Sequence, residues 1–134
     1  MKRVLICDDD TLIGRLFTRF FRNAGYEAEL ALGGYEAMQR CAQRRPDVVV
    51  TDILMPKGDG FELINHLRQN HPGVPIIAMT GSPDDAILQE AQQLGVERRF
   101  RKPFDMRQLL QAVQEELAPG PAGVAPAGVA PLVA

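Results

Sequence analysis

Short apolar runs alternate with longer segments of helical periodicity through most of the chain. Runs such as residues 4–7 (VLIC) and 48–50 (VVV) are too short for a helix and contain many β-branched residues, which is typical of buried strands. The longer segments repeat apolar residues every three or four positions, which is typical of amphipathic helices. This regular alternation predicts an α/β fold, in which helices cover both faces of a doubly wound parallel sheet.

Five strands and five helices follow from this pattern. Strands are expected over residues 4–7, 27–30, 48–50, 74–79 and 98–101. Helices are expected over residues 11–23, 35–43, 61–70, 83–94 and 106–117. In the first helix, Leu12, Leu16 and Phe20 are spaced four apart, so this side of the helix is expected to face the core. Arg15 and Arg19 are expected to face water.

The last part of the chain has a different composition. Beyond Ala118 it consists mainly of proline, glycine, alanine and valine, it has no charged residue, and the sequence AGVAP at 122–126 recurs at 127–131. Such a segment gains little from ordering and is typical of a linker or tail. We therefore predict one domain over residues 1–118 and a disordered tail or linker over residues 119–134.

Composition and charge exclude several classes of protein. With 24% charged residues and a formal net charge of -2, the chain is neither a strongly basic nucleic-acid binder nor an acidic disordered protein. Cys7 and Cys41 lack the spacing of a zinc or redox motif. No apolar stretch approaches the roughly 20 residues that cross a bilayer, and no signal peptide is visible, so we expect a cytoplasmic protein without membrane contact.

Reactive or ion-binding side chains stand at the ends of four of the five expected strands. Asp8 and Asp9 follow the first strand, Asp52 follows the third, Thr80 the fourth and Lys102 the fifth. In an open parallel sheet, functional groups gather outside the carboxyl ends of the strands. We therefore expect these side chains to meet in one pocket.

The residue types in this pocket indicate a particular chemistry. Three neighbouring carboxylates repel one another unless a cation lies among them, and an all-oxygen ligand set suits Mg²⁺. A lysine and a hydroxyl at the same place supply the positive charge and the neutral donor that phosphoryl oxygens need. The neighbouring Asp10 is expected to cap the first helix instead.

Over residues 2–117 the chain resembles the receiver domains of two-component response regulators, of the chemotaxis-protein type. Four motifs in order carry the resemblance: Asp8-Asp9, then Asp52-Ile53-Leu54-Met55-Pro56 with Gly60, then Thr80-Gly81, then Lys102-Pro103-Phe104. Each motif alone is weak, but the ordered set is specific. The resemblance implies a flavodoxin-like fold with strand order 2-1-3-4-5.

The resemblance also implies a role for each site residue. Asp52 would be the phosphoacceptor, and it would ligate Mg²⁺ together with Asp9, with Asp8 mainly through water, and with the backbone carbonyl of Leu54.

Two further residues would act on the phosphoryl group. Thr80 would turn to hydrogen-bond it and Lys102 would pair with it, with a cis peptide bond between Lys102 and Pro103. The small Gly81 would leave access for the phosphodonor. Such a domain is not an enzyme in the usual sense, because it catalyses only its own phosphorylation and dephosphorylation.

The implied partners are a sensor histidine kinase or phosphotransfer protein, and a downstream effector protein or domain. The sequence leaves open whether phosphorylation causes the domain to dimerise. No direct contact with nucleic acid is expected from this domain.

Two positions depart from the family pattern. The aromatic residue that often switches its rotamer is replaced by Arg99, so either Arg99 reorients in its place or Thr80 and the following loop carry the signal. The positions two past Asp52 and two past Thr80, which in the family influence the hydrolytic water, hold Leu54 and Ser82. Because an apolar side chain cannot hold a water, we predict slow self-dephosphorylation.

Three other functions compete with a phosphoaccepting receiver. A degenerate receiver would only bind partners, and it is disfavoured because no pocket residue is missing. A phosphatase of the haloacid-dehalogenase type would need an acid/base aspartate two residues after the nucleophile, where this chain has Leu54. A nucleotide-binding flavodoxin-like protein would need a glycine-rich phosphate loop after a strand, and none is present.

Overall fold

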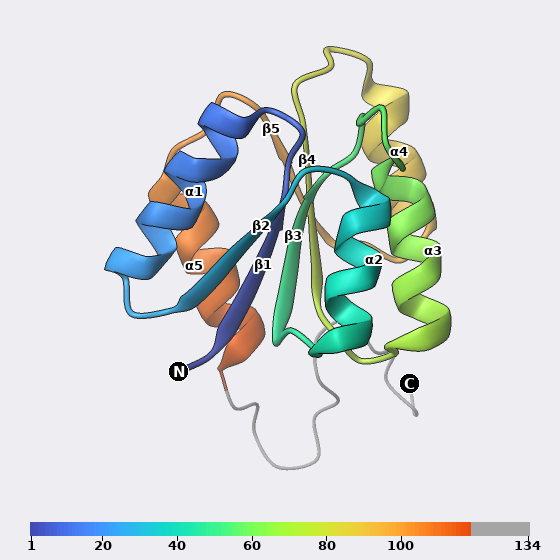
Figure 1. The fold of residues 1–134 in the computed structure, drawn as a ribbon. Helices are drawn as coiled ribbons and strands as arrows, with labels where there is room; N and C mark the ends of the chain where they lie inside the picture. Colours follow the sequence, from blue (N-terminus) through green and yellow to red (C-terminus); the bar gives the residue numbers. More distant parts are fainter. Residues whose placement is uncertain (119–134) are drawn as a thin grey trace, which may run out of the picture.

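A five-stranded parallel sheet runs through the middle of the computed structural model, which describes residues 1–118 (Figure 1). The strands are β1 (Arg3–Cys7), β2 (Glu27–Ala31), β3 (Val48–Asp52), β4 (Ile76–Thr80) and β5 (Arg98–Arg101). They lie in the order β2-β1-β3-β4-β5, and every neighbouring pair is parallel. The expected strand order is confirmed. The tail expected over 119–134 lies outside the described residues.

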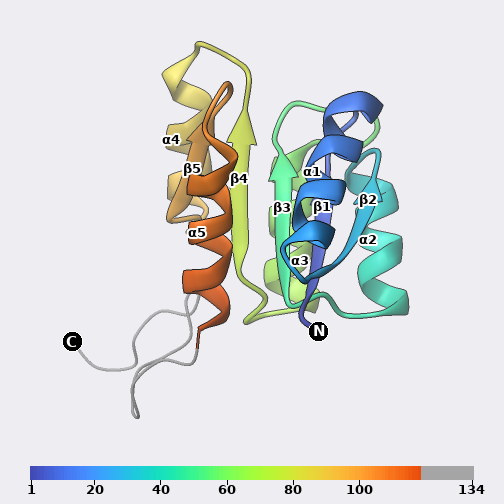
Figure 2. The same cartoon turned by 90° about the vertical axis from the view of Figure 1, so that its left-hand side faces the viewer.

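Five helices cover the two faces of the sheet. They are α1 (Thr11–Asn23), α2 (Gly34–Gln43), α3 (Gly60–Asn70), α4 (Asp85–Gln93) and α5 (Met106–Leu117). Figures 1 and 2 show α1 and α5 on one face and α2, α3 and α4 on the other. The doubly wound α/β architecture expected from the sequence is therefore confirmed. No described helix combines the length and the apolar character needed to cross a membrane.

The alternation of side chains along β1 explains why there are two cores. Leu5 and Cys7 point into the core beneath α2, α3 and α4, whereas Val4 and Ile6 point into the core beneath α1 and α5. All four side chains are fully buried. Continuous apolar runs are what a parallel sheet covered on both faces requires.

The prediction of which face of α1 is buried is wrong. Leu12 is 68% exposed and Leu16 is 53% exposed, while Phe17 and Phe21 pack against the sheet. Gly14 allows this orientation, because a Cβ atom there would lie 2.5 Å from Cδ1 of Leu30 on the adjacent strand. The helix therefore turns its glycine and phenylalanines toward the sheet and leaves two leucines in water.

Two elements begin two residues later than expected. Strand β4 begins at Ile76 rather than Val74, because Pro75 has no N–H to donate to a neighbouring strand. Helix α4 begins at Asp85, and the side chain of Asp84 caps it by accepting a hydrogen bond from the N–H of Ala86. Pro83 thus lies in the preceding loop.

Candidate functional site

The carboxyl ends of the strands bring the expected side chains to one end of the sheet, at the top of Figure 1. The pairing of Cys7 with Thr51, Asp52 with Met79 and Thr80 with Arg101 aligns the ends of β1, β3, β4 and β5. A cavity of about 390 Å³ opens there. It is lined by Asp8, Asp9, Asp10, Asp52, Leu54, Thr80, Gly81, Ser82 and Lys102.

Three carboxylates form an acidic cluster in this cavity. Asp8, Asp9 and Asp52 each offer an oxygen, and these oxygens all lie within 4.8 Å of one another. Asp8 is fully buried, Asp52 is 8% exposed and Asp9 is exposed. Asp10 does not join the cluster as a ligand, since its side chain caps α1 by accepting from the N–H of Ile13 at 3.1 Å.

Lys102 places one positive charge against the buried side of the cluster. Its ammonium donates to Oδ2 of Asp8 at 2.7 Å and to Oδ2 of Asp52 at 3.3 Å. Burial by itself would lower the pKa of Lys102, but the hydrogen bond to Asp8 and the charge of Asp52 outweigh burial, so the pKa is raised. The Lys102–Pro103 peptide bond is cis, as expected.

The carboxyl of Asp52 has a raised pKa. Burial raises the pKa of its carboxyl to about 6, Lys102 opposes the rise, and the charges of Asp8 and Asp9 add to it. The N–H of Ile53 donates to its Oδ1 at 3.2 Å. Asp52 therefore ionises near neutral pH and gains from any further positive charge in the cavity.

Thr80 connects the cavity to the β4–α4 loop. The side chain is fully buried, and its hydroxyl oxygen accepts a hydrogen bond from the N–H of Ser82 at 3.1 Å. From the next strand, Arg101 donates to the carbonyl of Ser82 at 3.2 Å and to Oδ1 of Asp85 at 2.7 Å. Both strand ends thus hold the same loop.

The donor set fits a divalent cation. Three carboxylates face one ammonium, so two negative charges are uncompensated when all three are ionised. Oxygen-only ligands suit Mg²⁺, which retains several waters. The exposed Asp9 and the open cavity leave room for those waters.

Sequence reasoning missed an apolar groove beside Lys102. Its cavity of about 390 Å³ is lined by Ile13, Phe17, Lys102, Pro103, Phe104 and Met106. The Lys102 ammonium lies 5.8 Å from the centroid of the Phe17 ring, close enough for a cation–π contact. The signal in the sequence was Phe17, which lies alongside the expected apolar face of Leu12, Leu16 and Phe20 and is the residue of this set that the structure buries.

The family model that matches the chain is described as the response regulator receiver domain, and it covers residues 4–114. The chain belongs to the response regulator receiver family. A receiver domain of this kind has the strand order and the acidic cluster found above.

Relatives and solved structures agree with this assignment. The chain is 31% identical to sporulation initiation phosphotransferase F of Bacillus subtilis over 116 residues, which cover 87% of this receiver and 94% of that protein. It is 34% identical to response regulator MprA of Mycobacterium sp. strain KMS over 81% of its own length, but it spans only 47% of MprA.

The structure of a CheY-like receiver domain protein from Methanospirillum hungatei superimposes with a TM-score of 0.82 at 29% identity. The match covers 87% of this receiver and 94% of that chain.

Proposed function

We propose that this receiver domain accepts a phosphoryl group on Asp52 in a Mg²⁺-dependent reaction and changes conformation as a result. The observation that carries the proposal is the acidic cluster of Asp8, Asp9 and Asp52 with Lys102 donating to Asp52 from the same cavity. The donor would be a sensor histidine kinase, a phosphotransfer protein or a small acyl phosphate. The reaction would take place in the cytoplasm.

Ligands for the ion would come from the carboxylates of Asp9 and Asp52 and from the backbone carbonyl of Leu54, with Asp8 acting mainly through water. When bound, Mg²⁺ supplies positive charge that offsets the repulsion between carboxylate and phosphoryl oxygens. Lys102 adds a second positive charge, since its ammonium already contacts two of the carboxylates.

Asp52 would act as the nucleophile. One carboxylate oxygen attacks phosphorus, and a new P–O bond forms while the bond between phosphorus and the donor breaks. The electron pair of the broken bond stays with the donor, so a histidine donor then takes up a proton and acetyl phosphate releases acetate. The pKa of about 6 leaves Asp52 largely ionised at neutral pH, as a nucleophile must be.

The switch would start at Thr80. A phosphoryl group adds roughly -1.5 to -2 charge and three acceptor oxygens. In this structure the Thr80 hydroxyl oxygen accepts a hydrogen bond from the N–H of Ser82. If the hydroxyl turns to donate to a phosphoryl oxygen, this hydrogen bond is lost. The β4–α4 loop can then move, and a downstream effector protein or domain reads the new surface. Residues 1–118 would form this module, with 119–134 as a tail or linker.

The phosphodonor protein would dock over α1 and the β5–α5 segment. Leu12 and Leu16 are exposed there, beside the apolar groove that contains Phe17 and Phe104 next to Lys102. A partner helix that covers these side chains would bring its phosphohistidine to the cavity. Leu16→Glu should slow transfer from the cognate kinase several-fold and leave labelling by acetyl phosphate unchanged; slowing of both reactions would contradict this docking surface.

Intact-protein mass spectrometry tests the proposed function. Acetyl phosphate with Mg²⁺ should add one phosphoryl group to the protein, and neither a chelator-treated sample nor Asp52→Asn should gain it. No mass gain in the unaltered protein would favour a receiver that only binds partners. Sustained turnover of a phosphate ester would instead favour a phosphatase, although Leu54 stands where such enzymes carry their acid/base aspartate.

A further inference from the structure

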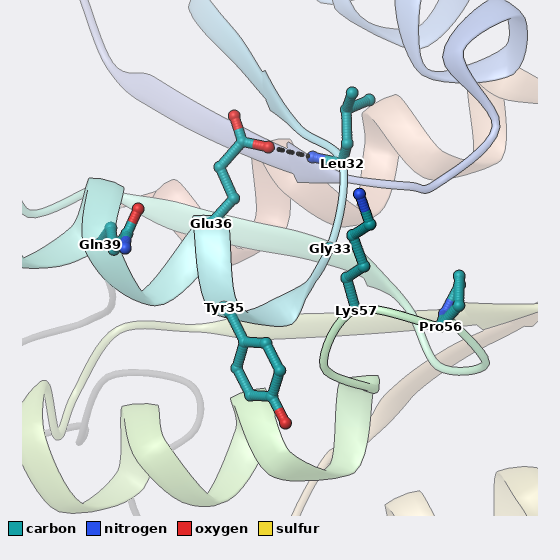
Figure 3. A pocket seen from close by; sticks show the side chains of 7 residues that line it. All are labelled: Leu32, Gly33, Tyr35, Glu36, Gln39, Pro56 and Lys57. Carbon is teal, nitrogen blue, oxygen red and sulfur yellow. Dashed lines mark hydrogen bonds between the residues drawn. The ribbon is translucent and has the colours of Figure 1, made fainter.

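The β3–α3 loop, which carries Leu54, is attached to the β2–α2 loop by backbone contacts. The N–H of Gly34 donates to the carbonyl of Gly58 at 2.7 Å, and the N–H of Tyr35 donates to the carbonyl of Lys57 at 3.3 Å. Figure 3 shows Lys57 beside the segment that carries Gly33, with Tyr35 pointing away from it. We call Gly33, Gly34, Lys57 and Gly58 the glycine clamp.

Only glycine fits on the β2–α2 side of the clamp. A Cβ atom on Gly33 would lie 2.5 Å from the carbonyl oxygen of Lys57, and one on Gly34 would lie 2.6 Å from that of Gly58. Both neighbours are backbone atoms, so a methyl group fits only if one loop moves. Gly58 has a φ of +87°, which other residues rarely adopt.

The rest of the β3–α3 loop is held by its own surroundings. At its end, the N–H of Gly60 donates to the carbonyl of Ile53 at 2.6 Å. Near its start, Met55 is buried with its sulfur 3.6 Å from that of Cys7. The clamp therefore adds a hold from a separate segment of the chain, between these two points and three residues after Leu54 in the sequence.

We propose that Gly33 and Gly34 are positioning residues for the metal site. Gly34 holds the Gly58 carbonyl, and Gly33 leaves room for the Lys57 carbonyl, which the N–H of Tyr35 holds. Together they fix the path of the β3–α3 loop and so the place of the Leu54 carbonyl relative to the carboxylates. This inference rests on the proposed function, because it assumes that Leu54 contributes to Mg²⁺ binding. Residues that orient a metal ligand without touching the metal typically change affinity by 10–100-fold when replaced.

Gly34→Ala is the direct test, with Mg²⁺ titrated by calorimetry. We expect the dissociation constant for Mg²⁺ to rise by roughly tenfold. Gly14→Ala is the matched control, since its new Cβ would also be crowded, at 2.5 Å from Leu30, but on α1 and away from the β3–α3 loop. The control should lose stability and keep the Mg²⁺ affinity of the unaltered protein.

The outcomes separate the clamp from the proposed function. A folded Gly34→Ala protein with unchanged Mg²⁺ affinity would overturn the role of the clamp and leave the metal site intact. Failure of the unaltered protein to bind Mg²⁺ would overturn the metal site itself, and the inference with it.

A second measurement decides the question if Gly34→Ala does not fold. Because coupling is reciprocal, Mg²⁺ should slow hydrogen exchange of the Gly34 N–H in the unaltered protein. It should not slow exchange of the His71 N–H, which bonds Leu67 at the far end of α3. Equal behaviour of the two amides would overturn the inference.

Discussion

The ammonium of Lys102 lies 3.3 Å from Oδ2 of Asp52 and donates a hydrogen bond to it. The same ammonium holds the fully buried Asp8 at 2.7 Å. Lys102 therefore compensates negative charge in the cavity. Under the proposed function it would also be the positive partner of a phosphoryl group on Asp52.

Lys102→Met should destabilise the protein by roughly 3 kcal/mol in metal-free buffer at neutral pH, because it leaves Asp8 and Asp52 buried without their cation. Mg²⁺ should restore much of this loss and should bind the variant more tightly, since no ammonium competes for the carboxylates. Denaturant unfolding with and without Mg²⁺ measures both effects. Arg107→Met, which breaks the exposed pair with Asp105, is the control and should change little. An equally stable Lys102→Met protein would contradict the prediction.

Asp52→Asn should stabilise the metal-free protein at pH 7.5, by roughly 2–3 kcal/mol. The pKa of Asp52 is raised from 3.8 to about 6, so folding favours its protonated form. In the unaltered protein, the contribution of protonated Asp52 to the free energy of unfolding is fully present below pH 3.8 and is lost as the pH rises through about 6. Asparagine does not ionise. The extra stability of the variant over the unaltered protein should therefore shrink as the pH falls from about 6 to 3.8, and it should vanish near pH 4. A difference that does not depend on pH would show that Asp52 ionises normally in the fold.

Leu54→Asn should accelerate loss of the phosphoryl group. The side chain of Leu54 is 48% exposed at the mouth of the cavity and cannot hydrogen-bond a water, whereas an amide can. A tenfold gain corresponds to about 1.4 kcal/mol in the barrier, which one well-placed water contact can supply. Phosphate release after removal of excess acetyl phosphate gives the rate, and Leu54→Met serves as the apolar control. An unchanged rate in Leu54→Asn would count against the predicted slow self-dephosphorylation.

Arg101 rather than Arg99 should couple β5 to the switch loop. Arg101 bonds the Ser82 carbonyl and Asp85, whereas Arg99 bonds the carbonyls of Val96 and Glu97, away from that loop. Arg101→Gln should speed hydrogen exchange at the Asp84 amide, which donates to the Ser82 side chain, and Arg99→Gln should not. If Arg99→Gln loosens the loop as much as Arg101→Gln, the signal leaves through Arg99.

The strands and the composition of the site could be predicted because they depend on local patterns. Each strand is a short apolar run, and the residue that follows it marks the carboxyl end, so Asp52 and Thr80 could be assigned to the site without coordinates. The family resemblance supplied the order of the strands. Bonds such as Lys102 to Asp8 join residues far apart in the chain, and no local pattern indicates them.

The orientation of α1 could not be predicted because the helix has two apolar stripes. Leu12 and Leu16 form one stripe and Phe17 and Phe21 the other, and hydrophobic spacing alone does not choose between them. Gly14 decides in favour of the phenylalanine side, because it lets the helix approach Leu30 closely. The stripe left in water gives the docking surface proposed above.

Borohydride reduction followed by peptide sequencing tests the central claim most directly. Reduction of an acyl phosphate converts the aspartate that carries it to homoserine, which marks the site permanently. After treatment with acetyl phosphate and Mg²⁺, homoserine should appear at position 52, and its yield should collapse when Mg²⁺ is chelated. Homoserine at Asp8 or Asp9 instead, or none at any position, would contradict the account.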